Sequence, residues 1–171
     1  MKTCIVSYSM SGNNEKLGKR VAESIGADFI KVTDVRKRSM MRTGFDMILN
    51  RTPKINENTS DIKAYDQIIF MAPVWMGQVA SPLRSYFKLI KDESLPYAFV
   101  TISGGTLNKN PKLRQGLKKN AGQGLVFMKD LYLADMNIDL DKESGMYSLT
   151  EEDLDYLTPL VVETIEIYYE I

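Results

Sequence analysis

The sequence has 171 residues, of which 44% are hydrophobic and 26% are charged, so one domain of 171 residues with a buried core is expected. It contains one cysteine, Cys4, and no histidine, which excludes an intrachain disulfide, a Cys/His metal cluster and the Ser-His or Cys-His pairs of many hydrolases. Cys4 is expected to pack in the core, and any chemistry is expected to come from a cofactor. No window reaches the roughly 18 apolar residues of a membrane span. Since a strand pattern starts directly after Lys2, no signal peptide is expected, and a cytoplasmic location is predicted.

The charges are unevenly distributed along a chain whose net charge is zero. Residues 1–128 contain 20 Lys and Arg against 10 Asp and Glu, whereas residues 129–171 contain 2 against 12. The sequence leaves open whether these parts form opposed patches in the folded protein or neutralise each other.

The first half of the chain alternates strand and helix patterns. Residues 3–8 are short, apolar and β-branched, as in a strand buried on both faces. A helix is predicted from residue 14, and further strands are predicted over residues 27–33 and 66–71. Residues 36–54 have many basic residues and apolar residues at roughly helical spacing, which indicates a basic amphipathic helix or structured loop ending before Pro53, or a plain surface crossover.

The second half continues the alternation. A helix is predicted from near Ser81-Pro82, a strand over residues 97–102, a helix after Pro111 and a strand beginning near Leu125. A long acidic connection, residues 134–150, precedes a last helix, and Thr150 with Asp153 approximates a capping box at its start. The predicted buried positions of the four helices are Leu17, Val21 and Ile25; Leu83, Tyr86, Phe87 and Ile90; Leu113, Leu117 and Ala121; and Leu154, Leu157, Val161 and Ile165. Strands alternating with helices five times predict an α/β fold with a parallel sheet and helices on both faces.

The loop between the first strand and the first helix has the composition of a phosphate-binding loop. It consists of Ser9, Met10, Ser11, Gly12, Asn13 and Asn14. The N-terminus of a helix offers unpaired N–H groups and a positive dipole end, and Gly12 lets a ligand approach the backbone. An ordinary helix capped by Ser or Asn is the alternative. The loop has neither the Lys-Ser/Thr of a Walker A motif nor the three glycines of a dinucleotide fingerprint.

This loop resembles the phosphate loop of the flavodoxin and flavodoxin-like FMN-binding family, Ser/Thr-x-Thr-Gly-x-Thr followed by an acidic residue. Ser9, Ser11, Gly12 and Glu15 fit that pattern, whereas Asn14 replaces its last Thr. The resemblance implies a three-layer, doubly wound α/β fold with a five-stranded parallel sheet in the order 2-1-3-4-5, and FMN as the cofactor. In that order, the loops after the first, third and fourth strands share one rim.

The loop after the third strand strengthens the resemblance. Pro73, Val74, Trp75, Met76 and Gly77, with Pro82 and Leu83, resemble the Pro-x-Trp-x-Gly element and following Pro-Leu of flavodoxin-like reductases. Trp75 is the only tryptophan, and we expect it to contact the flavin ring while Gly77 lets the backbone approach it. The alternative is that Trp75 covers the sheet edge or the core.

A third loop, containing Ser103, Gly104 and Gly105, matches the position where flavodoxins contact the pyrimidine edge of the flavin. Carrier flavodoxins commonly place a second aromatic residue here and are usually acidic, but this chain has Thr106 and Leu107 and is neutral. These departures favour an NAD(P)H-dependent oxidoreductase acting on a flat small acceptor. A flavodoxin-type electron carrier between protein partners and a cofactor-free binding module are the alternatives.

Basic residues are expected to surround the flavin site and to attract a nicotinamide nucleotide: Arg36, Lys37, Arg38, Arg42 and Lys109. A phosphoacceptor signalling domain is excluded because no aspartate ends the first or third strand. A nucleic-acid partner is not expected, since aromatic residues do not interleave the basic segments. A membrane is not expected either, because no window is long and apolar enough to span one.

Overall fold

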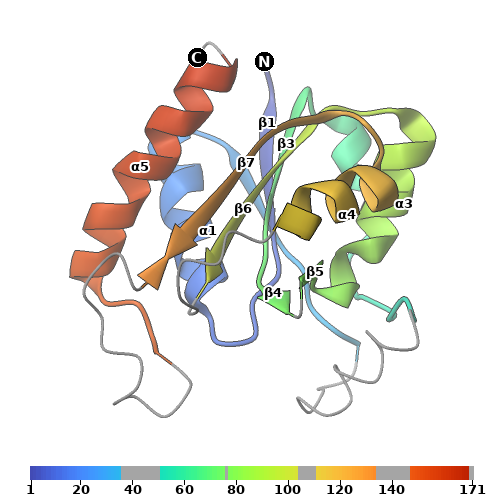
Figure 1. The fold of residues 1–171 in the computed structure, drawn as a ribbon. Coiled ribbons are helices and arrows are strands. Elements are labelled where there is room, and N and C mark those ends of the chain that lie inside the picture. Colours follow the sequence, from blue (N-terminus) through green and yellow to red (C-terminus); the bar gives the residue numbers. More distant parts are fainter. Residues whose placement is uncertain (36–50, 76, 104–110, 134–146, 170–171) are drawn as a thin grey trace.

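The computed structural model describes residues 1–35, 51–75, 77–103, 111–133 and 147–169. Its central sheet has five parallel strands in the order β2-β1-β3-β6-β7 (Figure 1). The strands are β1 (Thr3–Ser7), β2 (Asp28–Lys31), β3 (Gln67–Met71), β6 (Tyr97–Ser103) and β7 (Leu125–Tyr132). Since β6 and β7 are the fourth and fifth strands of this sheet, the predicted order 2-1-3-4-5 is confirmed.

Helices cover both faces of the sheet (Figure 1). One face carries α1 (Asn13–Ile25) and α5 (Glu151–Tyr169), and the other carries α3 (Arg84–Glu93) and α4 (Pro111–Ala121). Two short 3-10 helices, η1 (Thr59–Ala64) and η2 (Ser81–Leu83), precede β3 and α3. The helix predicted from Ser81-Pro82 therefore begins with a 3-10 turn. Of the basic segment predicted over residues 36–54, residues 36–50 lie outside the described part of the chain.

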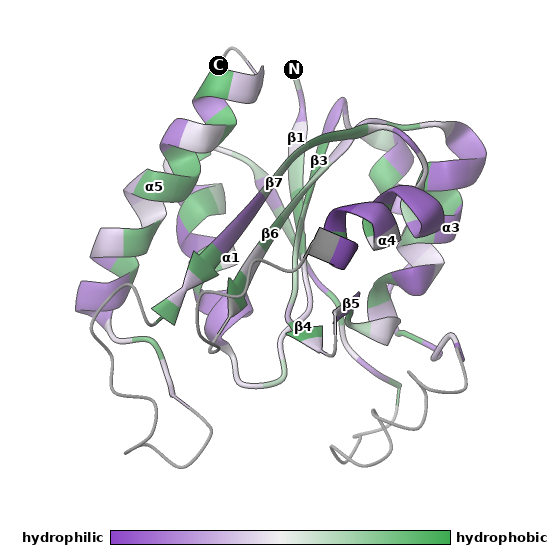
Figure 2. Cartoon of the chain, in the orientation of Figure 1, coloured by the Kyte–Doolittle hydropathy of each residue, from purple (hydrophilic) through white to green (hydrophobic). Residues whose placement is uncertain are grey.

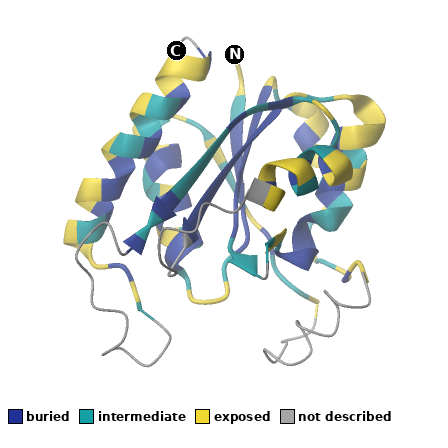
Figure 3. Cartoon of the chain, in the orientation of Figure 1, coloured by how far each residue is buried: buried dark blue, intermediate teal, exposed yellow. Residues whose placement is uncertain are grey.

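Two hydrophobic cores lie between the sheet and its helices (Figures 2 and 3). The core under α3 and α4 is rich in aromatic rings, with Phe70 edge-to-face against Phe87 at 5.2 Å between ring centroids. The core under α1 and α5 is mainly aliphatic. The apolar positions predicted for the helices are buried, except Ile25, which is partly buried. The periodicity therefore identified the inward faces correctly.

Two local predictions are confirmed. Cys4 is fully buried in β1, where burial and the nearby Asp28 raise the pKa of its thiol to about 12, so it acts as a small apolar core residue. At the start of α5, Asp153 N donates to Thr150 Oγ1 (3.2 Å), while Thr150 N donates to Asp153 Oδ2 (2.7 Å). This reciprocal pair is a capping box.

The described residues also decide part of the charge question. Arg20 of α1 pairs with both Glu151 and Asp155 of α5. Two acidic residues of the last helix, Glu151 and Asp155, are therefore neutralised by a basic residue of the first helix. Among the described residues, no helix is long and apolar enough to cross a membrane.

Candidate functional site

The ends of β1, β3 and β6 meet at one edge of the sheet, because these strands are neighbours and parallel. Backbone hydrogen bonds continue this pairing past the strands, from Tyr8 N to Met71 O (3.0 Å) and from Ala72 N to Val100 O (3.3 Å). The β1–α1 loop lies at this end of the molecule, as does the hairpin of β4 (Val74–Trp75) and β5 (Gln78–Val79) that follows β3 (Figure 1). The structure thus brings together the first two loops that the sequence analysis singled out.

The β1–α1 loop leaves the N-terminus of α1 without a side-chain cap. Gly12 occupies the cap position with φ +91°, a left-handed conformation that favours glycine, and no side chain accepts a hydrogen bond there. A Cβ built on Gly12 has no heavy atom within 4 Å apart from its chain neighbours. The alternative of an ordinary helix capped by Ser or Asn is therefore wrong, and the first N–H groups of α1 are available to a ligand.

The polar side chains of this loop differ in their surroundings. The Oγ of Ser9 is buried and has no hydrogen-bond partner among the described residues. Met10 and Ser11 are exposed, and Asn14 is buried. A buried hydroxyl without a partner is unfavourable by itself. The loop that leads to the uncapped N-terminus of α1 therefore contains a serine hydroxyl without a partner among the described residues.

Asn13 is used by the protein itself. Its Nδ2 donates to Tyr147 O (2.7 Å), and its Oδ1 accepts from Leu149 N (3.0 Å). Lys16 adds hydrogen bonds from Nζ to Ser148 Oγ and Leu149 O, both at 2.8 Å. The segment before α5 therefore braces the β1–α1 loop. The Asn13 side chain has both its polar atoms engaged, which leaves its backbone N–H for a ligand.

Glu15, the acidic residue of the loop pattern, lies in the first turn of α1. It forms ion pairs with Lys19 (3.1 Å) and with Lys31 of β2 (2.8 Å). Partial burial raises its pKa, but the hydrogen bonds and charges of Lys31 and Lys19 outweigh burial and lower the pKa below its ordinary value. Glu15 therefore stays ionised. Its negative charge in the first turn stabilises α1 through the helix dipole, and its two lysine partners balance that charge.

Trp75 lies in a short hairpin formed by β4 (Val74–Trp75) and β5 (Gln78–Val79), which pair antiparallel. Gly77 between them has φ +77°. The indole is half-buried and meets the ring of Tyr8 edge-to-face, with the two centroids 6.4 Å apart. Tyr8 in turn donates from its hydroxyl to Asp34 Oδ2 (3.1 Å). Trp75 thus touches the core through Tyr8 and also reaches the rim.

Several predicted site residues lie outside the described part of the chain. They are Met76, Gly104, Gly105 and the basic residues Arg36, Lys37, Arg38, Arg42 and Lys109. Ser103 ends β6, which places the start of the third loop beside the other two. Pro73 is half-buried just before β4, and its carbonyl accepts from Ala80 N (3.1 Å), which closes the base of the hairpin.

Two supports of this rim were not predicted from the sequence. The Tyr8 ring packs against Trp75 and is itself held by a hydrogen bond to Asp34. Residues 147–149 brace the β1–α1 loop. An aromatic residue directly before the loop was the available signal for Tyr8. The role of residues 147–149 depends on contacts more than 130 positions apart, for which the sequence has no local signal.

The described residues contain no group of three His, Cys, Asp or Glu side chains that could hold a metal ion. The site instead combines an uncapped helix N-terminus, a buried serine hydroxyl and a partly exposed indole. These groups can bind an anion at one end and a flat ring at the other.

The strand order, the helix layers and the rim define a flavodoxin-like fold. A flavoprotein in complex with FMN from Lactobacillus acidophilus NCFM is 24% identical, with a TM-score of 0.62 over 84% of this chain and 98% of that chain. A flavodoxin, WrbA-like protein from Agrobacterium tumefaciens is 16% identical, with a TM-score of 0.55 over 99% and 98%. A flavodoxin from the domain Archaea is 15% identical, with a TM-score of 0.55 over 99% of both chains. No protein-family model and no curated protein matches the sequence.

Proposed function

We propose that this protein binds FMN at the rim and uses it to carry electrons from a nicotinamide nucleotide to a flat small acceptor. The observation that carries the proposal is the N-terminus of α1, where Gly12 at φ +91° leaves the helix without a side-chain cap. The buried, unpartnered Oγ of Ser9 lies in the same loop. Free N–H groups, the helix dipole and a hydroxyl donor together fit a phosphate dianion.

The phosphate end would be held mainly by backbone groups. The N–H groups of the first turn of α1 and the Ser9 hydroxyl donate, and the absence of a Cβ at Gly12 leaves room for the phosphate oxygens. The bracing of Asn13 by residues 147–149 fixes these donors before the ligand arrives. A loop fixed in advance binds more tightly, because less conformational entropy is lost on binding.

The ring end would lie beside Trp75. Tyr8 holds the indole edge-on, and its own hydroxyl is fixed by Asp34, so the indole face has a defined direction. FMN supplies the one- and two-electron chemistry when bound, whereas the protein sets its position and access. The solved structure with FMN that shares this fold supports the choice of cofactor.

A nicotinamide nucleotide is proposed as the electron donor because positive charge lies beside the hairpin. Arg84 donates to Gln78 Oε1 of β5 (3.5 Å) and to the carbonyl of Arg51 (2.8 Å). The Arg84 guanidinium would attract an anionic nucleotide and raise its rate of encounter, an effect that salt weakens.

The test is anaerobic stopped-flow reduction of the FMN-loaded protein. Rapid loss of the flavin absorbance with NADH or NADPH supports the oxidoreductase. Loss of absorbance only with a flavodoxin reductase indicates an electron carrier between proteins. A protein that does not retain FMN on gel filtration and does not bind added FMN is a cofactor-free module, and the proposal then fails.

A further inference from the structure

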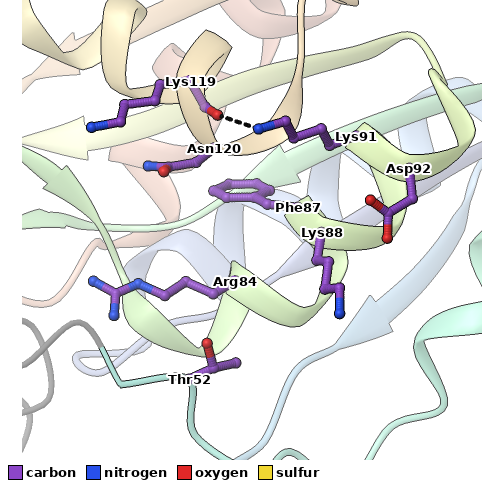
Figure 4. A pocket seen from close by; sticks show the side chains of 8 residues that line it. All are labelled: Thr52, Arg84, Phe87, Lys88, Lys91, Asp92, Lys119 and Asn120. Atoms are coloured by element: carbon purple, nitrogen blue, oxygen red, sulfur yellow. Dashed lines mark hydrogen bonds between the residues drawn. The ribbon is translucent and has the colours of Figure 1, made fainter.

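A groove lies between α3 and α4 (Figure 4). These helices cover the face of the sheet opposite α1 and α5 (Figure 1). Its volume is about 340 Å³. The residues that line it are Thr52, Arg84, Phe87, Lys88, Lys91, Asp92, Lys119 and Asn120. This volume is within the range of about 300–1,000 Å³ that is usual for small-molecule sites.

The lining consists mainly of cationic and neutral hydrogen-bonding groups. Three ammonium groups, one guanidinium, a threonine hydroxyl and an asparagine amide face a single carboxylate, Asp92. Figure 4 shows the Phe87 ring between the Asn120 side of the groove and the Arg84 and Lys88 side. Its edge-to-face contact with Phe70 fixes this ring in the core, so it forms a rigid apolar part of the wall.

The lysines of the groove form no ion pair with a carboxylate in the part of the chain that the structure describes. Neither Lys88 nor Lys119 forms an ion pair with another residue of the described ranges. Lys91 Nζ donates to Lys119 O (3.2 Å) and links the two helices, which uses one of its three N–H donors. Helices α3 and α4 together carry seven basic and two acidic side chains. The groove is therefore a concave site of positive potential.

We propose that this groove binds the phosphates of a nucleotide-class organic anion. Lys88, Lys91 and Lys119 would pair with the phosphate oxygens, and the apolar stems of these lysines would contact the base. The inference does not rest on the flavin proposal, because all eight lining residues lie outside the rim loops. Arg84 joins one end of the groove to Gln78 of the hairpin, so the nucleotide is either the electron donor itself or a separate ligand.

The experiment measures binding of ADP and of inorganic diphosphate by calorimetry. The test variant is the double substitution Lys88→Gln/Lys119→Gln, which leaves the Lys119 carbonyl that accepts from Lys91 in place. The matched control is Lys112→Gln/Arg114→Gln, which removes the same charge from exposed positions of α4 outside the groove. Melting curves check that both variants are folded.

We expect the groove variant to weaken ADP binding about tenfold and the control to weaken it by less than about twofold. ADP should bind more tightly than diphosphate, because the base adds apolar contacts. Equal weakening by both variants would mean general attraction to a basic surface, and tighter binding of a single-stranded oligonucleotide than of ADP would indicate a nucleic-acid surface. Either result, or no ADP binding by the parent protein, would overturn the proposal.

NADPH kinetics on the same variants show whether the nucleotide bound in the groove is the electron donor or a separate ligand. A raised KM for NADPH in the groove variant, with an unchanged maximal rate of flavin reduction, identifies the donor as the ligand. Weakened ADP binding with unchanged NADPH kinetics identifies a separate nucleotide. If no nicotinamide nucleotide reduces the flavin, the proposed electron donor is wrong. The ADP measurement still tests whether the groove binds a nucleotide.

Discussion

The two faces of the sheet use their charges in different ways. On the α1/α5 face, Arg20 pairs with Glu151 and Asp155, and Lys16 donates to Ser148 and Leu149 at the end of the connection that leads to α5. On the α3/α4 face, Lys88, Lys112, Arg114, Lys118 and Lys119 form no ion pair within the described ranges. The first face therefore uses polar contacts to hold the β1–α1 loop, whereas the second leaves cations open to solvent and to ligands.

The largest effect is expected at the N-terminus of α1, which lies on the face that holds the β1–α1 loop. In Gly12→Val, a β-branched residue must adopt φ +91°, and its side chain takes the space proposed for the phosphate. We expect FMN affinity to fall at least about 100-fold. Titration of the apoprotein with FMN measures it.

Gly26→Val is the matched control at the other end of the same helix. Gly26 has φ +65°, and a Cβ there also has no heavy atom within 4 Å. Both variants should lose about 1–2 kcal/mol of unfolding free energy through backbone strain. Only Gly12→Val should lose FMN, and equal losses of FMN affinity in the two variants would refute the phosphate loop.

The brace between the loop and residues 147–149 comes next. Asn13→Ala removes the hydrogen bonds that join the β1–α1 loop to Tyr147 O and Leu149 N. We expect the unfolding free energy to fall by about 2 kcal/mol, measured by urea denaturation. A change below about 0.5 kcal/mol would show that this face is not held by the brace.

The acidic side chains of the α1/α5 face predict a loss of stability at low pH. The pKa of Glu15 and the pKa of Asp153 are both lowered: partial burial opposes this, but Lys31 and Lys19 act on Glu15, and hydrogen bonds from Tyr147 and Thr150 act on Asp153. A lowered pKa gives stability that is present above the ordinary values of 4.5 and 3.8, and that is lost as pH falls through the folded-state values.

Asp153→Asn tests this dependence through the capping box. At pH 7, we expect it to cost about 1 kcal/mol, and the slope of unfolding free energy against pH below about 4 should become shallower. Urea denaturation at a series of pH values gives both quantities. An unchanged slope would mean that the Asp153 carboxylate does not stabilise the start of α5.

The smallest expected effect tests the charge comparison directly. Arg20→Gln should lower the unfolding free energy by about 0.5–1 kcal/mol at low salt and by less at 0.5 M salt, because its ion pairs are partly exposed. Lys112→Gln on α4 should change it by less than about 0.3 kcal/mol at either salt concentration. Equal effects of the two substitutions would remove the distinction between the faces.

The fold was predictable because its elements are locally encoded. The buried strand runs and the helical stripes, such as Leu154, Leu157 and Val161, identified the strands, the inward faces and the start of α5. The order of the strands came instead from the resemblance to flavodoxins. The β4–β5 hairpin was not predicted, since strands of two residues are too short to show a period.

The site was predictable only in part. The sequence located the β1–α1 loop and Trp75, but it did not predict that both polar atoms of the Asn13 side chain contact residues 147–149. It also showed an excess of basic residues over residues 1–128, but it did not reveal that lysines from α3 and α4 line one groove. Both features arise from contacts between distant segments, which one sequence does not reveal.

The central claim is that the uncapped N-terminus of α1 binds the phosphate of FMN beside Trp75. The most direct measurement is the titration of apoprotein with FMN and with riboflavin, followed by Trp75 fluorescence, since Trp75 is the only tryptophan. We expect FMN to bind at least about 100-fold more tightly than riboflavin, and both ligands to quench the emission strongly at saturation. Equal dissociation constants for the two flavins, or unchanged emission at saturating FMN, would contradict the account.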